Sequence, residues 1–225
     1  MRRFDFIIHT ERGPESVTRS EWFKFLQPSD LIFIRNDNFG SDVIVWGSKI
    51  EAPPEALRFC VECSHAEGVT EPGTPASALT LSAGPTGFNI EYLNRLFEDR
   101  HKLTRLYVFR WLSDPDEQAE AVRIARELSA EDHSYKKRGI FGFARRVIRK
   151  LLKWPEPAPA KYELSGRSNI CSEAWARVAF RLGKKLTGGQ IPARVSPLEL
   201  SAFVSIHCEV NGLPGLIAEA RFIKP

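Results

Sequence analysis

The hydrophobic and polar positions along the chain form short apolar runs separated by turn residues. Runs of β-branched and aromatic residues that adjoin Gly, Pro, Ser or Asp predict strands. These runs lie at 29–35, 43–46, 60–69, 78–82, 103–112 and 203–210. We therefore expect a sheet built from short strands.

Apolar residues spaced three or four positions apart predict helices elsewhere. The clearest helix is at 113–128, because Ser113-Asp114-Pro115 can start a helix and acidic residues follow in its first turn. Weaker helical patterns lie at 16–27, 91–97, 173–182 and from Ser196-Pro197 onward. Short strands combined with a few helices predict an α+β fold in a single domain covering residues 1–225.

The composition is ordinary for a globular protein, with 43% hydrophobic and 27% charged residues. The net charge of +4 is too modest to indicate a nucleic-acid partner, and four cysteines are too few for a disulfide scaffold. The N-terminal segment lacks the apolar core of a signal peptide, and no apolar run approaches the roughly 18 residues of a transmembrane helix. We therefore expect a cytoplasmic protein.

A basic amphipathic segment occupies residues 136–154. Eight lysines and arginines occur between residues 136 and 155 with no acidic residue among them, and aromatic and aliphatic residues are interleaved. A helix over 140–153 would separate an apolar side from a basic side. Prolines at 155, 157 and 159 then form a stiff connector. We expect an insertion at about 136–160.

Three interpretations of this insertion stay open. Its apolar side can pack on the parent domain while its charges are solvated, which is the interpretation we favour. Alternatively, residues 136–153 can contact an anionic membrane or a partner. Contact with nucleic-acid phosphates through the same residues is a third interpretation, although no specific nucleic acid is expected.

Cys171 is the main candidate for chemistry. An extended segment gives way to a helical pattern at this residue. A thiol in the first turn of a helix faces unpaired backbone N–H groups and the positive end of the helix dipole, which stabilise the nucleophilic thiolate. His65 lies far upstream and offers a base. A cysteine with a distant histidine is the arrangement of a cysteine hydrolase or acyltransferase.

Several short stretches, taken in order along the chain, resemble the circularly permuted papain-fold hydrolases of the NlpC type, the YiiX-like group. In that group the histidine precedes the cysteine, as His65 precedes Cys171. The matching stretches span about Ser29 to Leu200, most of the chain. They are Ser29-Asp30-Leu31-Ile32-Phe33, Ser64-His65-Ala66, Thr80-Leu81-Ser82-Ala83 with Gly87, Tyr107-Val108-Phe109-Arg110, Tyr135, Ile170-Cys171-Ser172-Glu173 and Ser196-Pro197.

The resemblance implies a permuted papain-like fold, with a small antiparallel sheet or barrel packed on helices. It implies that Cys171 attacks a carbonyl carbon, and that His65 first accepts the thiol proton and then protonates the leaving group. The third position, which orients the imidazole, aligns with Ser82. The group often has a carboxylate there, so Ser82 is a departure, for which a nearby carboxylate such as Glu67 can substitute.

The resemblance also implies substrate contacts from Ser64, Tyr135 and Ser172, and no cofactor. Its substrates would be small peptide-like amides or lipid acyl groups. The opposing hypothesis is a binding module that keeps the fold but has little or no catalytic activity, with the basic segment contacting a membrane or a partner.

A metal site is a weaker interpretation of the same region. Cys60 and Cys63, followed by His65, have the spacing of half a zinc site. The second half is missing, because His207 and Cys208 are adjacent and would point to opposite sides of a strand. We therefore expect no bound metal.

Overall fold

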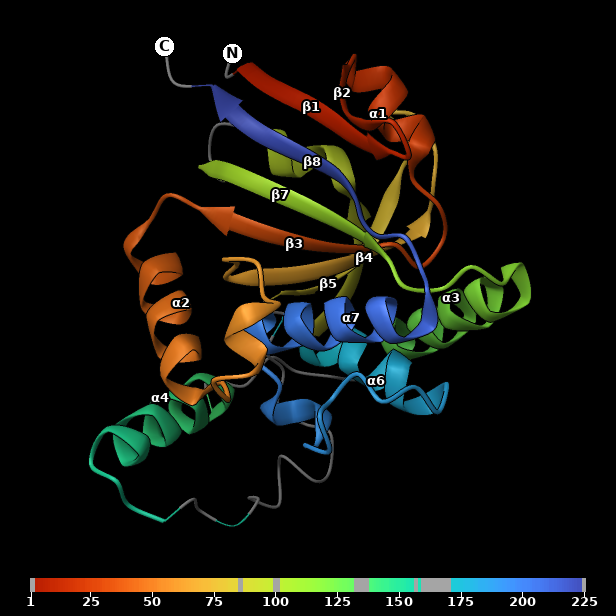
Figure 1. The fold of residues 1–225 in the computed structure, drawn as a ribbon. Helices are drawn as coiled ribbons and strands as arrows, with labels where there is room; N and C mark the ends of the chain where they lie inside the picture. Colours follow the sequence, from red (N-terminus) through yellow and green to blue (C-terminus); the bar gives the residue numbers. More distant parts are fainter. Residues whose placement is uncertain are drawn as a thin grey trace.

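The computed structural model describes residues 3–84, 87–98, 102–131, 138–155, 158 and 171–223. These residues form an α+β fold, as predicted, in which eight antiparallel strands make one sheet in the order β2-β1-β8-β7-β3-β4-β5-β6. Figure 1 shows this sheet above a group of helices.

The strands are β1 Arg3–Thr10, β2 Gly13–Val17, β3 Leu31–Asn36, β4 His65–Glu71, β5 Leu79–Gly84, β6 Gly87–Tyr92, β7 Leu103–Arg110 and β8 Gly215–Ile223. The α-helices are α1 Arg19–Phe25, α2 Phe39–Glu51, α3 Pro115–Ala130, α4 Arg138–Leu151, α6 Glu173–Arg181 and α7 Pro197–Asn211. Short 3₁₀ helices are η1 Ala56–Arg58, η2 Leu93–Phe97 and η4 Pro192–Arg194.

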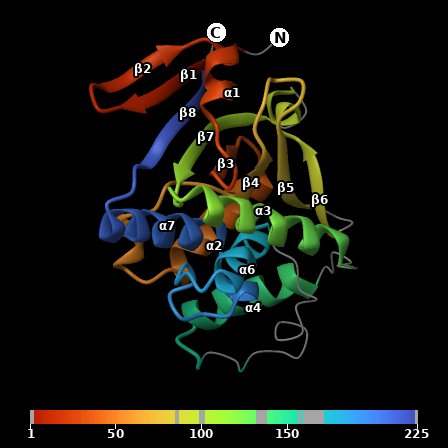
Figure 2. The ribbon, with the colours of Figure 1, turned by 90° about the vertical axis from the view of Figure 1, so that its right-hand side faces the viewer.

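The sheet has a hydrophobic core on each face. Successive side chains of a strand point to opposite faces, and β3 shows this directly. Leu31 and Phe33 belong to a core shared with α3, α6 and α7, whereas Ile32 and Ile34 belong to a second core shared with α1 and η2. Figure 2 shows α3, α6 and α7 gathered on one side and the β1–β2 hairpin with α1 at the far end.

The second core also shows that the sheet curls. Phe6 of β1 and Phe97 of η2, which follows the edge strand β6, come from opposite ends of the strand order. Their rings nevertheless lie 5.5 Å apart. The sheet therefore bends round the second core. It is antiparallel, as predicted, and has eight strands.

Two predicted strands are wrong, because helix caps override their β-rich sequences. Residues 43–46 lie within α2, where the Asn38 side chain accepts a hydrogen bond from the backbone N–H of Ser41. Residues 203–210 lie within α7, which Ser196 and Glu199 start with a reciprocal capping box. Propensity is a weak guide where caps and tertiary packing favour another structure.

Three strands at the end of the sheet were not predicted. The β1–β2 hairpin and β8 pair with one another and with β7. Strand β8 is almost fully paired on both sides, so it lies inside the sheet although it comes last in the chain. Its identity as a strand depends on partners that are remote in sequence.

Helix α4 lies within the predicted basic insertion and packs on α2. A side-chain atom added at Gly47 of α2 would lie 2.8 Å from Phe143 and 3.1 Å from Val147, so the two helices approach closely at this glycine. Arg146 forms an ion pair with Glu51 of α2 at 2.7 Å. Part of the apolar side of α4 therefore packs on the domain. Each helix that the structure describes is too short or too polar to cross a bilayer.

Helix α6 docks on the sheet through Trp175. The indole is fully buried, and its N–H donates to the carbonyl oxygen of Leu81 on β5 at 3.1 Å. Its ring lies over Gly68 of β4, where an added Cβ would be only 2.2 Å from the ring. A side chain at position 68 would therefore displace the helix or the indole.

We predict that Gly68→Ala destabilises the protein by about 1–3 kcal/mol, because overpacking a tight core forces side chains or backbone to move. Denaturant unfolding measures this change. Gly40→Ala is the matched control, since its nearest neighbour would lie at 3.4 Å and alanine favours the helix that contains it. Equal stabilities for the two variants would contradict the close packing of Trp175.

Candidate active site

The structure brings the predicted thiol and imidazole together. His65 is the first residue of β4, and Cys171 lies two residues before α6. The Cys171 thiol and the His65 ring lie close enough for each to shift the pKa of the other. The sulfur also lies 3.6 Å from the carbonyl oxygen of Ser64. Two groups more than a hundred residues apart in sequence therefore meet at one end of β4.

The position of Cys171 differs by a small step from the prediction. The N-cap of α6 is Ser172, so Cys171 precedes the first turn instead of lying within it. The sulfur still interacts with backbone N–H groups, those of Ser172 and of Ala66 on β4. Such donors stabilise a thiolate, as the prediction required.

His65 contacts two acceptors through its Nε2 atom. The carboxylate of Glu67 lies 3.0 Å from this nitrogen, and the hydroxyl of Ser82 lies 3.2 Å from it. His65 and Glu67 are two apart on β4, so their side chains share one side of the strand. Because Nε2 is occupied, Nδ1 is the ring nitrogen available to the Cys171 sulfur.

Glu67 anchors the imidazole and is itself firmly held. Its side chain is 1% exposed and accepts from Arg95 at 2.6 Å and from the Thr80 hydroxyl at 2.7 Å. Burial alone would raise the pKa of Glu67, but the hydrogen bonds and charges of His65 and Arg95 outweigh it and lower the pKa to about 2. The carboxylate is thus ionised and faces the imidazole.

The electrostatics favour a thiolate and an imidazolium. Burial opposes both charges, yet the contact of Cys171 with His65 lowers the pKa of the thiol. For His65, burial alone would lower the pKa. The Cys171 sulfur and Glu67 outweigh this effect and raise the pKa of His65 to about 10. Both shifts favour the charged pair, thiolate and imidazolium, over the neutral pair.

The other three cysteines behave differently. Burial raises the pKa of Cys60, Cys63 and Cys208, the last to about 11. Cys171 therefore differs from them in having a lowered pKa and a partner base. Among the described residues, no group of three or more His, Cys, Asp or Glu side chains is arranged to hold a metal ion.

The side chains predicted to bind substrate are placed as follows. Ser64 is buried and its hydroxyl accepts from Ser41 at 2.6 Å, and the buried Ser172 hydroxyl donates to the carbonyl oxygen of Val195. Both hydroxyls are engaged within the fold, so their contacts with a substrate stay a prediction. Tyr135 lies outside the described residues.

Arg95 was not anticipated from the sequence. It lies on η2 and is 28 residues from its partner Glu67. Its other partner is Glu91, at 2.5 Å. An arginine in a short, mainly apolar segment carries no sequence signal of this role, because the contact depends on how β4, β6 and η2 come together.

Neither the family profiles nor the curated protein sequences contain a match to this chain. Among solved structures, the chain is similar to the metalloprotein yiiX from Escherichia coli O157:H7, with a TM-score of 0.46 and 14% sequence identity. The alignment covers 85% of this chain and 95% of that one.

We predict that iodoacetamide alkylates Cys171 at about pH 6 roughly tenfold or more faster than Cys60, because only Cys171 has a lowered pKa. Mass spectrometry of digested protein measures both rates. His65→Gln removes the cation that stabilises the thiolate, so alkylation of Cys171 should slow and require a higher pH. An unchanged pH profile in this variant would argue against the ion pair.

We also predict a pH-dependent contribution of Glu67 to stability. Its pKa falls from an ordinary 4.5 to about 2 on folding, so its contribution is full above pH 4.5 and is lost as the pH falls toward 2. The contribution is on the order of 3 kcal/mol and is shared with its partners. The free-energy gap between wild type and Glu67→Gln, measured by urea unfolding, should shrink over this range. A constant gap would contradict the lowered pKa.

Proposed function

We propose that the protein is a thiol-dependent hydrolase that cleaves an amide or ester through an acyl-enzyme intermediate. One observation carries the proposal. Cys171 lies beside His65, which lowers the pKa of the thiol, and the buried carboxylate of Glu67 holds His65 in place. Nucleophile, base and orienting group are the three parts that nucleophilic catalysis by cysteine requires.

The reaction follows from this arrangement. The Cys171 thiolate attacks the substrate carbonyl carbon, and the resulting tetrahedral intermediate expels its amine or alcohol as that group takes the His65 proton. A thioester on Cys171 remains. Neutral His65 then removes a proton from water, which attacks the thioester and releases the acid. The expelled thiolate and the imidazolium are thereby restored.

We assign the orienting role to Glu67 together with Ser82. Glu67 supplies the negative charge that Ser82 lacks, and both lie within hydrogen-bonding distance of Nε2. The carboxylate stabilises the imidazolium, whereas the hydroxyl only helps to align the ring. With Glu67 supplying the charge, the proposed orienting group contains a carboxylate although position 82 is a serine.

The proposal includes the circularly permuted papain-like fold. The order of the groups supports it, since the strand that carries His65 precedes the helix that follows Cys171. Helix α6 packs on β4 and β5 through Trp175. This packing places Cys171, just before the helix, beside the start of β4. The side chain of His65 is 24% exposed, so a substrate in solution can reach the reacting groups.

We predict that Cys171→Ala abolishes hydrolysis of activated esters and amides, and that His65→Gln lowers kcat/KM roughly hundredfold or more, because general acid–base catalysis is lost. Glu67→Gln should have a larger effect than Ser82→Ala, since only Glu67 carries charge. Steady-state kinetics and mass detection of a thioester on Cys171 measure these effects.

A different result would favour the binding module. Negligible and equal rates for wild type and Cys171→Ala across a broad ester and amide panel would contradict the hydrolase, even if alkylation of Cys171 is fast. Cys208→Ala is the matched control, because its thiol is buried and has no base beside it. It should leave the rates unchanged.

A further inference from the structure

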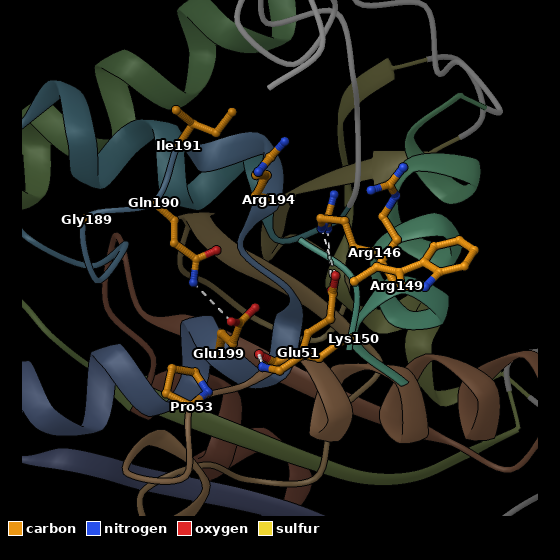
Figure 3. A pocket seen from close by; sticks show the side chains of 11 residues that line it. Glu51, Pro53, Arg146, Arg149, Lys150, Gly189, Gln190, Ile191, Arg194 and Glu199 are labelled. Atoms are coloured by element: carbon orange, nitrogen blue, oxygen red, sulfur yellow. Dashed lines mark hydrogen bonds and ion pairs between the residues drawn. The ribbon is translucent and has the colours of Figure 1, made fainter. Parts of the chain in front are cut away.

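A basic pocket lies where α4 meets α2, η4 and the start of α7. Its volume is about 590 Å³, and Figure 3 shows its charged side chains converging from these elements. Four cations line it, namely Arg146, Arg149, Lys150 and Arg194, together with two carboxylates, Glu51 and Glu199. The cations outnumber the carboxylates by two, so the pocket has a net positive charge.

Both carboxylates are engaged by other residues of the fold. One oxygen of Glu199 is used by the N-cap of α7 and the other accepts from Gln190 at 3.1 Å. Glu51 is bound by Arg146 at 2.7 Å. Burial raises the pKa of Glu51 to about 7, although Arg146 opposes this effect. The pocket is therefore suited to an anion such as a phosphate.

Next to the pocket, α4 and the turn after it expose large apolar side chains. Ile148, Leu151, Leu152 and Trp154 are each more than half exposed. Arg145, Ile148, Arg149 and Leu152 follow the spacing i, i+3, i+4 and i+7, so cations and aliphatic side chains share one face. Described residues 138–155 contain no acidic side chain. This combination of exposed apolar groups and cations characterises helices that lie in a membrane interface.

We propose that this face of α4 docks on an anionic phospholipid surface, with Ile148, Leu151, Leu152 and Trp154 entering the headgroup and acyl boundary and the basic pocket receiving a lipid phosphate. Charge complementarity selects this occupant. An apolar partner alone would supply no counter-charge for Arg145 and Arg149, whereas anionic headgroups pair with cations beside inserted apolar side chains. The docking does not depend on the proposed thiol chemistry.

The orientation of α4 makes the docking possible without unfolding. Phe143 and Val147 hold one side of the helix against Gly47 of α2, and Arg146 anchors it to Glu51. The exposed row occupies another side, so the apolar residues that pack the domain and those that face solvent are different. The helix can meet a surface while it stays attached to the domain.

Vesicle co-sedimentation tests the proposal with the full chain. We expect binding to phosphatidylcholine vesicles that contain phosphatidylserine, little binding to pure phosphatidylcholine, and weaker binding as salt is added. The double variant Ile148→Ser, Leu151→Ser should bind roughly tenfold more weakly, because less apolar surface is inserted. Arg145→Gln with Arg149→Gln should weaken binding and reduce its salt dependence.

The matched control is Val210→Ser, which changes a 77% exposed apolar side chain on α7, away from the cations. It should bind as wild type does. Circular dichroism and Cys171 alkylation check that each variant is folded, and unchanged alkylation separates this test from the hydrolase proposal.

Three outcomes would overturn the docking proposal. One is equal binding by wild type and the α4 variants. Another is saturation of the pocket by inorganic phosphate, seen by calorimetry, with no binding to either vesicle, which would make it a site for a soluble anion. The third is a concentration-dependent dimer that the same variants dissociate, which would make the row a contact between copies of the chain.

Discussion

The packing of the Trp175 indole against the bare backbone of Gly68 fixes the distance between the helical layer and the sheet. Without a side chain at position 68, the ring lies directly on β4 and reaches across to bond with Leu81 of β5. Two adjacent strands are thus held to one helix by a single rigid side chain. Because Cys171 lies just before this helix and His65 begins β4, the same contact sets the separation of the two groups.

Cys171 and His65 are the first members of a series of charged groups, in which each charge stabilises the next. Starting from a Cys171 thiolate, the charges alternate in sign through His65, the buried Glu67 and Arg95 to Glu91, which is 43% exposed. An ionised carboxylate as buried as Glu67 would be strongly unfavourable alone, but a cation on each side offsets its loss of hydration. The buried carboxylate in turn favours a protonated His65, and the imidazolium favours a deprotonated Cys171. The reactivity of the partly buried thiol therefore depends on a carboxylate that solvent hardly reaches.

The sequence predicted features that short motifs along the chain specify. It did not predict features that depend on contacts between residues remote in sequence. Cys171, His65 and Ser82 could be grouped because short motifs occur in a fixed order along the chain. The part played by Glu67 was only an alternative, and Arg95 gave no signal, because both depend on how β4 and η2 approach. Residues 203–210 alternate like a strand, yet the cap at Ser196 commits them to a helix. Strand β8 was not predicted, because its residues form a strand by pairing with β1 and β7, which are remote in sequence.

The place of β8 inside the sheet bears on how the chain folds. Strand β1 pairs with β8, and contacts such as that between His9 and Glu219 join residues 210 positions apart. Closing so large a loop carries an entropic penalty before any pairing is gained, and topologies of this kind fold slowly. During synthesis on the ribosome, the β1–β2 hairpin has no neighbouring strand until nearly the whole chain has emerged. Until then the edges of β1 and β7 that β8 will cover are exposed, and unpaired strand edges are open to aggregation or to capture by a chaperone.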